Sequence, residues 1–315
     1  MNKERHRFHH PYTITLAISV SLLSGTLVLA SHQRERTTIS QTSNGEEPVT
    51  KPAVSAAIEQ YVRAKYAGDV ETVKSRTHHD IARRSVTDTY WGASSKEWIR
   101  TYSQDQLGFY ADPDGPHRLA NPESGRCDIE VFDLETMTAS ARVIMDDVVD
   151  YLHMIHFEGR WLIADSAVII LEEHGQRPPA TSKRYEETVT ALARDYCVGF
   201  YEIDGGKVQS TCHPSLSKRT IEHARTPNTP IFDYLSSISF EEINLLGETF
   251  NKHWDFDPET ARCQIEVYEI RGNVAAVKMT GSIWFDYFHM MKVNGEWSIV
   301  NILYESLDKS RWTDT

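Results

Sequence analysis

The chain contains one five-residue pattern twice, and this duplication restricts the fold more than any other feature of the sequence. Asp-Tyr-x-His-Met occurs at residues 150–154 and again at residues 286–290. The match extends on both sides, because residues 126–163 align without a gap on residues 262–299 and share 13 identities in 38 positions. We therefore predict two tandem copies of one domain.

A second aligned block, residues 61–84 over residues 196–219, lengthens the repeat towards the N-terminus. A chain of 315 residues also fits two domains of about 150 residues each. The predicted organisation is a signal peptide at 1–30, a disordered linker at 31–52, a first domain at 53–172, a linker at 173–184, a second domain at 185–306 and a tail at 307–315.

The first thirty residues predict export. Residues 1–12 are basic and rich in histidine, and residues 13–30 form an uncharged apolar run that ends in small residues. The run is close to the minimum length of a membrane span, so an uncleaved N-terminal anchor is the alternative. We predict a periplasmic or secreted protein that has no stable membrane insertion after processing. Residues 31–52 are polar without apolar periodicity, which predicts a disordered tether.

The charge and cysteine content narrow the range of partners. The chain has 33 basic and 45 acidic residues, a net charge of −12, which argues against nucleic acid as a partner. Export would permit disulfides. Cys197 could pair with Cys212, Cys127 could pair with Cys263, or all four could be free buried thiols. No motif indicates a cofactor or a zinc site.

The apolar periodicity changes once within each copy. Apolar residues near position 60 recur at spacings of three and four, which predicts a helix. Ser103 with Gln106, and Ser239 with Glu242, predict capping boxes that start a later helix. From Cys127 onwards the period is two, as in a half-buried strand. The predicted fold class is α+β, with about three helices packed on a curved antiparallel sheet in each copy.

Several of these residues together resemble a known superfamily. His213-Pro214 with Lys218-Arg219, the Asp-Tyr-x-His-Met strand and the segment 294–301 are similar to the nuclear transport factor 2-like superfamily, in particular its putative lumazine-binding branch. The first copy departs from this pattern, because it has His79 where the second copy has Pro214 and Asp165 where the second copy has Asn301. The resemblance implies a cone-shaped domain with a pocket between the helices and the concave face of the sheet. Members of the superfamily include ketosteroid isomerases, scytalone dehydratases and non-catalytic binding domains.

Strand alternation selects the candidate ligand-binding residues. Tyr287 and His289 share one face of their strand, and the other residues of that face are apolar, so we expect this face to line a pocket. An internally satisfied tyrosine and histidine in the core are the alternative. His78 and His213 are expected at the end of the second helix, either as caps or at the mouth of the cone. The candidate ligand-binding residues are His213, Tyr287, His289, His78, Tyr151 and His153.

The opposite strand face carries Asp150 or Asp286, and in the second copy Trp284 and Phe288 lie beside it, which indicates a surface covered by the other copy in a pseudo-dimer. A turn-capping aspartate with scattered surface aromatic residues is the alternative. The first functional hypothesis is an exported protein that binds a small hydrophobic or aromatic molecule and is non-catalytic or weakly catalytic. The second is a dehydratase- or isomerase-like enzyme with a Tyr/His/His pocket. The third is a structural pseudo-dimer that binds another protein. No catalytic residue and no metal site is assigned.

Overall fold

The two copies fold into two six-stranded sheets, each with three α-helices of its own. The computed structural model describes residues 46–87, 96–112, 121–171, 179–224 and 232–307. The predicted signal peptide therefore lies outside the described residues, as do most of the predicted linker and tail segments.

The elements of the first copy occur in the predicted order of helices followed by strands, with one additional pair of strands between the second and third helices. They are α1 (Lys51–Ala67), α2 (Val70–Ser75), β1 (Thr77–Thr87), β2 (Trp98–Tyr102), α3 (Gln104–Tyr110), the short 3-10 helix η1 (Pro122–Ser124), β3 (Asp128–Leu134), β4 (Thr138–Ile144), β5 (Val148–Phe157) and β6 (Arg160–Ile170).

The second copy repeats this order. Its elements are α4 (Glu186–Tyr201), α5 (Gly205–Ser210), β7 (Cys212–Ala224), β8 (Phe232–Ile238), α6 (Phe240–Trp254), β9 (Gln264–Arg271), β10 (Val274–Thr280), β11 (Trp284–Val293) and β12 (Glu296–Ser306). The sheets have the orders β2-β1-β6-β5-β4-β3 and β8-β7-β12-β11-β10-β9.

Each sheet contains one parallel pair, β1 with β6 and β7 with β12, and its other pairs are antiparallel. The sequence analysis expected only about four antiparallel strands per copy. It missed β1 because burial there does not alternate, and five consecutive residues from Ile81 to Ser85 are buried, including two arginines. It also placed His78 and His213 at helix ends, whereas both lie in the first strand of their sheet.

Local sequence signals explain the ends of several elements. The two predicted capping boxes are confirmed, since Ser103 and Ser239 each accept a hydrogen bond from the third residue of the helix that follows. Helix α1 ends at Gly68, whose φ of 75° is a conformation that glycine adopts without strain. The tight turn between β11 and β12 uses Asn294 and Gly295, with φ values of 52° and 89°.

The segment before α1 packs on the first copy, although the sequence placed it in a tether. The backbone nitrogen of Glu47 donates to the carbonyl of Gly159 at 2.9 Å. The carboxylate of Glu47 accepts from the backbone of Trp161 and from the guanidinium of Arg76, both at 2.8 Å. These contacts are polar and involve the backbone, so apolar periodicity could not reveal them.

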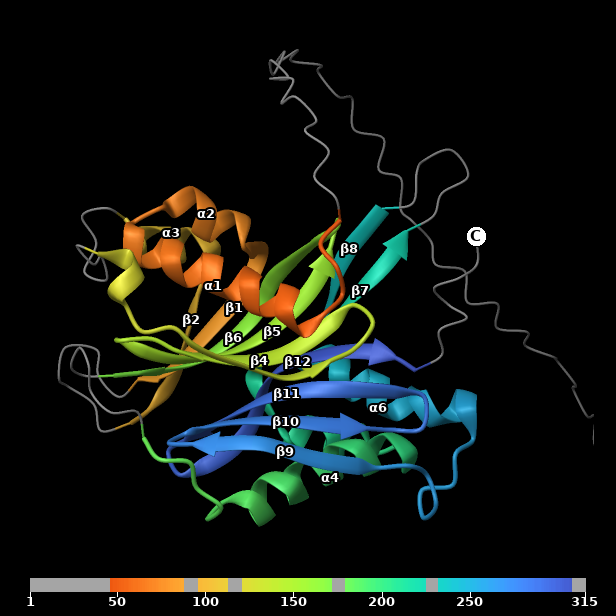
Figure 1. The fold of residues 1–315 in the computed structure, drawn as a ribbon. Coiled ribbons are helices and arrows are strands. Elements are labelled where there is room, and N and C mark those ends of the chain that lie inside the picture. The colour runs from red at the N-terminus through yellow and green to blue at the C-terminus, as the bar shows by residue number, and fades with distance from the viewer. Residues whose placement is uncertain (1–45, 88–95, 113–120, 172–178, 225–231, 308–315) are drawn as a thin grey trace, which may run out of the picture. The chain divides into compact units, whose positions relative to one another are not determined.

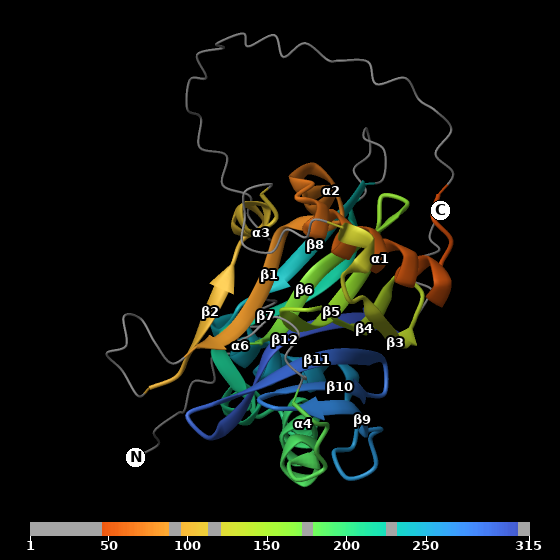
Figure 2. The same ribbon diagram turned by 60° about the vertical axis from the view of Figure 1, so that its left-hand side comes forward.

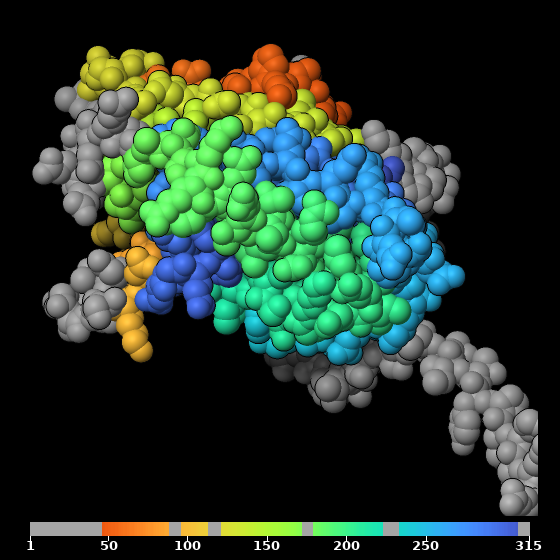
Figure 3. Space-filling model, turned by 90° about the horizontal axis from the view of Figure 1, so that it is seen from below, coloured from red at the N-terminus to blue at the C-terminus, as the bar shows by residue number. Residues whose placement is uncertain are grey.

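The helices lie on the outer faces of the two sheets (Figures 1 and 2). Seen from below, segments of the second copy cover most of the surface, and the first copy appears along the upper and left edges (Figure 3). Inside each copy, the helices and the concave sheet face enclose an apolar core. Among the described residues, no helix is long and apolar enough to cross a bilayer. All four cysteines are free thiols.

The opposite faces of the two sheets pack against each other through apolar clusters that mix residues of both copies. Two polar contacts at the margin of this interface join equivalent residues of the two copies. The hydroxyl of Tyr151 donates to Glu269 at 3.1 Å, and the hydroxyl of Tyr287 donates to Asp133 at 2.8 Å. Tyr151 and Tyr287 are 136 positions apart, as are Asp133 and Glu269. The tandem arrangement therefore resembles the self-complementary contact of a two-fold dimer.

Candidate functional site

The structure places the predicted Tyr/His face between the two sheets and not inside the cones. Tyr151, Tyr287, His153 and His289 are each 0% exposed. The rings of His153 and His289 stack with centroids 3.6 Å apart and an angle of 18° between their planes. Tyr287 and His289 do share one strand face, as predicted. The sequence analysis expected this face to point into the cone, whereas it points towards the other sheet. Both strand faces are buried, so an apolar pattern fits either one.

The stacked histidines are held in neutral form. Burial lowers the pKa of His153, and burial together with its neighbour His153 lowers the pKa of His289 well below its usual value. Nδ1 of His289 lies 3.2 Å from the amide nitrogen of Asn301, and Nδ1 of His153 lies 3.8 Å from the carboxylate of Asp165, the residue equivalent to Asn301. This pair contributes to the contact between the copies and does not line the cavity described below.

His78 and His213 occupy equivalent places and make equivalent backbone contacts. Nδ1 of His78 accepts from the backbone nitrogen of Asp80 at 3.2 Å, and Nδ1 of His213 accepts from that of Ser215 at 3.1 Å. Burial lowers the pKa of His78 to about 4 and also lowers the pKa of His213. Because the contact recurs in both copies, we interpret it as part of the local backbone conformation.

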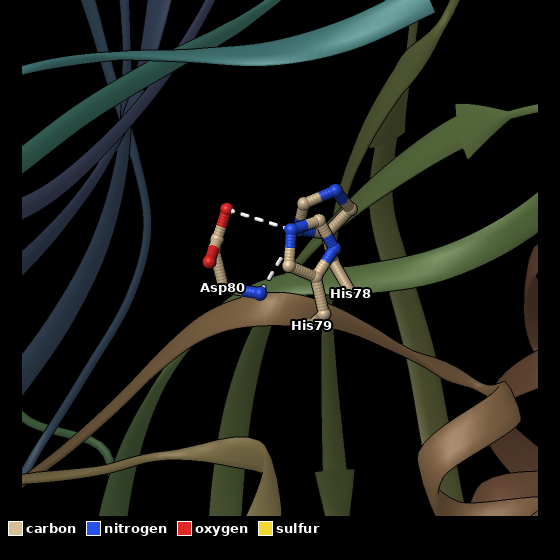
Figure 4. Close-up of side chains that lie close together, drawn as sticks. All are labelled: His78, His79 and Asp80. Carbon is tan, nitrogen blue, oxygen red and sulfur yellow. Dashed lines mark hydrogen bonds and ion pairs between the residues drawn. The ribbon is translucent and has the colours of Figure 1, made fainter. Parts of the chain in front are cut away.

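Only in the first copy do two further potential metal-ligating side chains adjoin this histidine. His79 and Asp80 lie beside His78, and the ligating atoms of the three residues are within 4.8 Å of one another (Figure 4). Nε2 of His79 lies 3.1 Å from the carboxylate of Asp80. The lone pair of Nδ1 in His78 is already used by the Asp80 backbone. A metal at that nitrogen would have to displace this hydrogen bond, so we propose no metal site here.

The aspartate of the repeated motif faces the interior of its cone. In the first copy Leu152 and Met154, on the same strand face as Asp150, join the core formed with the helices. In the second copy Phe288 and Met290, on the same face as Asp286, do the same. Asp150 and Asp286 are both 0% exposed. The sequence analysis expected the other copy to cover this face, whereas the helices of the same copy cover it.

The first cone contains a cavity of about 490 Å³ between its helices and the concave face of its sheet. Three tyrosines, Tyr61, Tyr102 and Tyr110, form part of its wall. The other lining residues are Lys65, Val73, Arg83, Arg100, Leu107, Asp147, Val148, Val168, Ile170 and Leu171. The cavity is therefore mostly apolar and aromatic, with a few charged groups, which is the usual character of a small-molecule site.

Two buried ion pairs adjoin the cavity. Nζ of Lys65 lies 3.0 Å from Oδ2 of Asp147, and both side chains are less than a tenth exposed. The guanidinium of Arg83 lies 3.3 Å from Oδ2 of Asp150, and the other oxygen of Asp150 accepts a hydrogen bond from Ser166. Burial lowers the pKa of Lys65 and raises the pKa of Asp150, so each charged form depends on its partner.

The corresponding positions of the second cone are apolar and filled with aromatic rings. Phe200 stands where the first copy has Lys65, Ile283 where it has Asp147, and Trp284 where it has Val148. Phe200 and Trp284 pack on Phe250, with ring centroids 5.5 and 4.8 Å away. Helix α6, which carries Phe250, has 15 residues, whereas its counterpart α3 has 7. Larger side chains therefore stand in the second cone at positions equivalent to Lys65, Asp147 and Val148 of the cavity wall.

Among the described residues of the second cone, one ion pair corresponds to those of the first. Lys218, the equivalent of Arg83, bonds to Asp286, and the second oxygen of Asp286 accepts from Nε1 of Trp284 at 2.8 Å. The ammonium of Lys218 also lies over the ring of Tyr304, 4.3 Å from its centre. Neighbouring side chains of the second copy therefore satisfy this buried pair.

A comparison with protein families supports the duplication. A family model described as "Putative lumazine-binding" matches the chain twice, at residues 50–167 and 184–305. The chain belongs to this family. Both copies adopt the cone-shaped fold expected for it, with three helices against a curved sheet.

Comparisons with solved structures and with curated proteins complete this result. An NTF2-like protein of unknown function from Silicibacter pomeroyi is 17% identical over 38% of this chain and 94% of that chain, with a TM-score of 0.30. A second one from Shewanella baltica is 16% identical over 40% and 97%, with a TM-score of 0.30. A ketosteroid isomerase-like protein from Erwinia carotovora is 16% identical over 40% and 99%, with a TM-score of 0.29. No curated protein matches the chain in sequence.

The site residues that the sequence analysis missed in this putative lumazine-binding chain are Lys65, Arg83 and Asp147. The signal that could have found them is a difference between the copies and not a similarity. Lys65 lies on the buried face of α1, four residues after Tyr61, where the second copy has Phe200. A charged residue at a core position of only one copy indicates a site that the other copy lacks.

Proposed function

We propose that this protein binds a small, flat, mostly apolar molecule in its first cone and does not transform it. The observation that carries the proposal is the cavity of about 490 Å³ in that cone, with two buried ion pairs beside it. The second cone is the internal comparison, because aromatic side chains pack in its core at the equivalent positions.

The buried charges of the first cone support a functional role. Removing two charges from water costs several kcal/mol for each ion, and an apolar pair of similar volume is often as stable or more stable. The second copy contains such a pair, Phe200 and Ile283, and keeps the same fold. Since folding does not require Lys65 and Asp147, we assign them to ligand recognition.

The same geometry supports binding without catalysis. A general base needs a carboxylate or imidazole that is free to take a proton from the substrate. Asp147 and Asp150 are both ion-paired, and the histidines of the Tyr/His face lie between the sheets. We therefore assign the tyrosines and histidines of the original candidate list a structural role, and we move the proposed binding site to the first cone.

The proposal is tested with N-phenyl-1-naphthylamine, an uncharged aromatic probe whose fluorescence increases in an apolar site. We expect saturable binding with one site per chain. Val148→Trp places in the first cone the residue that stands in the second, so this variant is expected to lose binding. Leu245→Trp adds the same residue on the outer face of α6, where Leu245 is 62% exposed, and is expected to bind like the parent.

Circular dichroism and thermal unfolding would show whether the Val148→Trp variant is folded. Absence of saturable binding to the parent, or unchanged binding to a folded Val148→Trp variant, would refute the proposed site. Export remains a separate prediction. N-terminal sequencing of the mature protein should begin near residue 31, whereas an intact Met1 would support the anchored alternative.

A further inference from the structure

We infer that the ligand of the first cone carries an anionic group, such as a carboxylate or sulfonate, which binds to the guanidinium of Arg83. The inference rests on the proposed function and adds the chemical class of the ligand. Three observations carry it: the charge balance of the cavity wall, the incomplete bonding of Arg83 and the contrast with the second cone.

The wall of the cavity has an excess of positive charge. It includes the cations of Lys65, Arg83 and Arg100 and the anion of Asp147, and the anion of Asp150 lies behind Arg83. With each group in its usual ionised form, three positive and two negative charges leave one positive charge. The two buried pairs are each neutral, so the excess positive charge lies on the exposed guanidinium of Arg100, where it would attract an anionic ligand.

Arg83 is the lining residue with an unused donor. Its side chain is 9% exposed, and its Nε has no hydrogen-bond partner among the described residues. Its ion pair with Asp150, at 3.3 Å, is not a hydrogen bond, since Oδ2 of Asp150 also has no hydrogen-bond partner there. Buried donors of folded proteins are almost always bonded, so an unbonded guanidinium nitrogen beside a cavity indicates an acceptor supplied by a ligand.

The second cone shows that the fold can complete this bonding by itself. Lys218 replaces Arg83 there and bonds directly to Asp286, and Trp284 donates to the other carboxylate oxygen. The equivalent of Trp284 in the first copy is Val148, which lines the cavity and cannot donate a hydrogen bond. The first copy has thus kept the carboxylate, exchanged lysine for arginine and left space where the second copy has an indole.

The mouth of the cavity fits an anion attached to an aromatic ring. Arg100 is exposed, and its guanidinium lies over the ring of Tyr102, 4.9 Å from its centre. An exposed cation at an entrance attracts an approaching anion. Tyr61 and Tyr110 provide aromatic surface further along the wall. The ligand that fits this wall has a flat apolar body and one acidic group at its edge.

Two probes that differ in one group test the inference. 1-Anilinonaphthalene-8-sulfonate has the ring system of N-phenyl-1-naphthylamine with an added sulfonate. We expect the sulfonate probe to bind the parent protein at least about tenfold more tightly, in line with one charge-assisted hydrogen bond. Competition between the two probes would show that they share one site.

Arg83→Lys is the main variant, because the second copy already holds a lysine at this place and folds with it. It keeps the positive charge but removes the Nε donor. We expect the affinity of the sulfonate probe to fall at least about fivefold more than that of the uncharged probe. Arg100→Gln changes an exposed residue, so it tests the charge at the mouth without disturbing the core, and we expect it to slow association of the sulfonate probe. Lys252→Gln removes an exposed cation of α6 and serves as the matched control.

The possible outcomes separate the inference from the proposed function. If both probes bind equally tightly to the parent, or if Arg83→Lys and Arg100→Gln leave the sulfonate probe unaffected, the anionic class is wrong while the binding site stands. If neither probe binds, the proposed function itself fails. Equal displacement of both probes by added benzoate and by benzamide would also contradict the inference, since only benzoate has the charge that Arg83 is expected to bind.

Discussion

The two cones of this protein have the same fold and opposite interiors. The first has two buried ion pairs beside a cavity of about 490 Å³, and the second has a packed group of aromatic rings around one ion pair. Since the sheet order and the helix order agree, the interior residues are not what determines this fold. Two different interiors therefore support one fold, and the proposed function rests on the residues that differ between them.

The largest effect is expected when one member of the Lys65–Asp147 pair is removed. Lys65→Ala should lower the free energy of unfolding by about 3–5 kcal/mol, because it removes the cation beside a buried carboxylate. Urea unfolding followed by circular dichroism measures this change.

The double variant Lys65→Phe with Asp147→Ile gives the first cone the residues of the second. We expect it to be at least as stable as the parent and to bind neither naphthalene probe. A double variant that is as unstable as Lys65→Ala would show that the first cone needs the Lys65–Asp147 pair in order to fold. This result would contradict the assignment of the pair to ligand recognition.

Opening the second cone should have an effect of comparable size. Trp284→Ala removes a side chain that packs on Phe200 and Phe250 and bonds to Asp286, so we expect a loss of about 3–5 kcal/mol from the cavity alone. Val148→Ala in the first cone is the matched change, and we expect a smaller loss because Val148 already borders open space. Equal losses from the two variants would contradict a packed second interior.

The stacked histidines between the sheets predict a loss of stability in acid. Burial holds the pKa of His153 and of His289 below the unfolded value of about 6.5, so the unfolded chain binds more protons at lower pH. The free energy of unfolding should therefore be highest above about pH 6.5 and should fall as the pH is lowered below this value. His289→Gln should flatten this fall in urea titrations at pH 7.5 and pH 5.5, and an unchanged slope would show that the pair is not responsible.

The smallest effects concern the two equivalent tyrosine contacts between the copies. Tyr151→Phe removes a hydrogen bond to Glu269, and Tyr287→Phe removes one to Asp133. We expect each to lower the free energy of unfolding by about 1–2 kcal/mol. Thermal or urea unfolding of the two variants measures both losses. If the two contacts are equivalent in energy as well as in geometry, the losses will agree. A difference between them measures how far the two copies have diverged at the interface.

Much of the architecture could be predicted from the sequence. The aligned blocks around Cys127 and Cys263 established the duplication, and the family resemblance supplied the cone. Capping boxes and tight turns depend on neighbouring residues, so Ser103 and Asn294 could be interpreted locally. The strands β1 and β7 could not, because a strand buried on both faces shows no alternation.

The site was harder to predict for a related physical reason. Alternation separates Tyr287 from Asp286, but it does not reveal which face meets the helices and which meets the other sheet when both are buried. The shared residues His153 and His289 lie between the two sheets and hold the copies together. The cavity wall contains shared residues such as Tyr61, but its charged residue Lys65 is replaced by Phe200 in the second copy.

Covalent linkage of the two copies has a consequence for how such a site can change. In a symmetric homodimer every substitution appears on both sides of the axis, so a destabilising charge in one interior is introduced twice. In this chain the contacts of Arg84 with Ser215 and of Arg219 with Ala164 join the halves as a dimer would be joined, yet each half has its own codons. One half can therefore act as a permanent scaffold while mutations explore new specificity in the other.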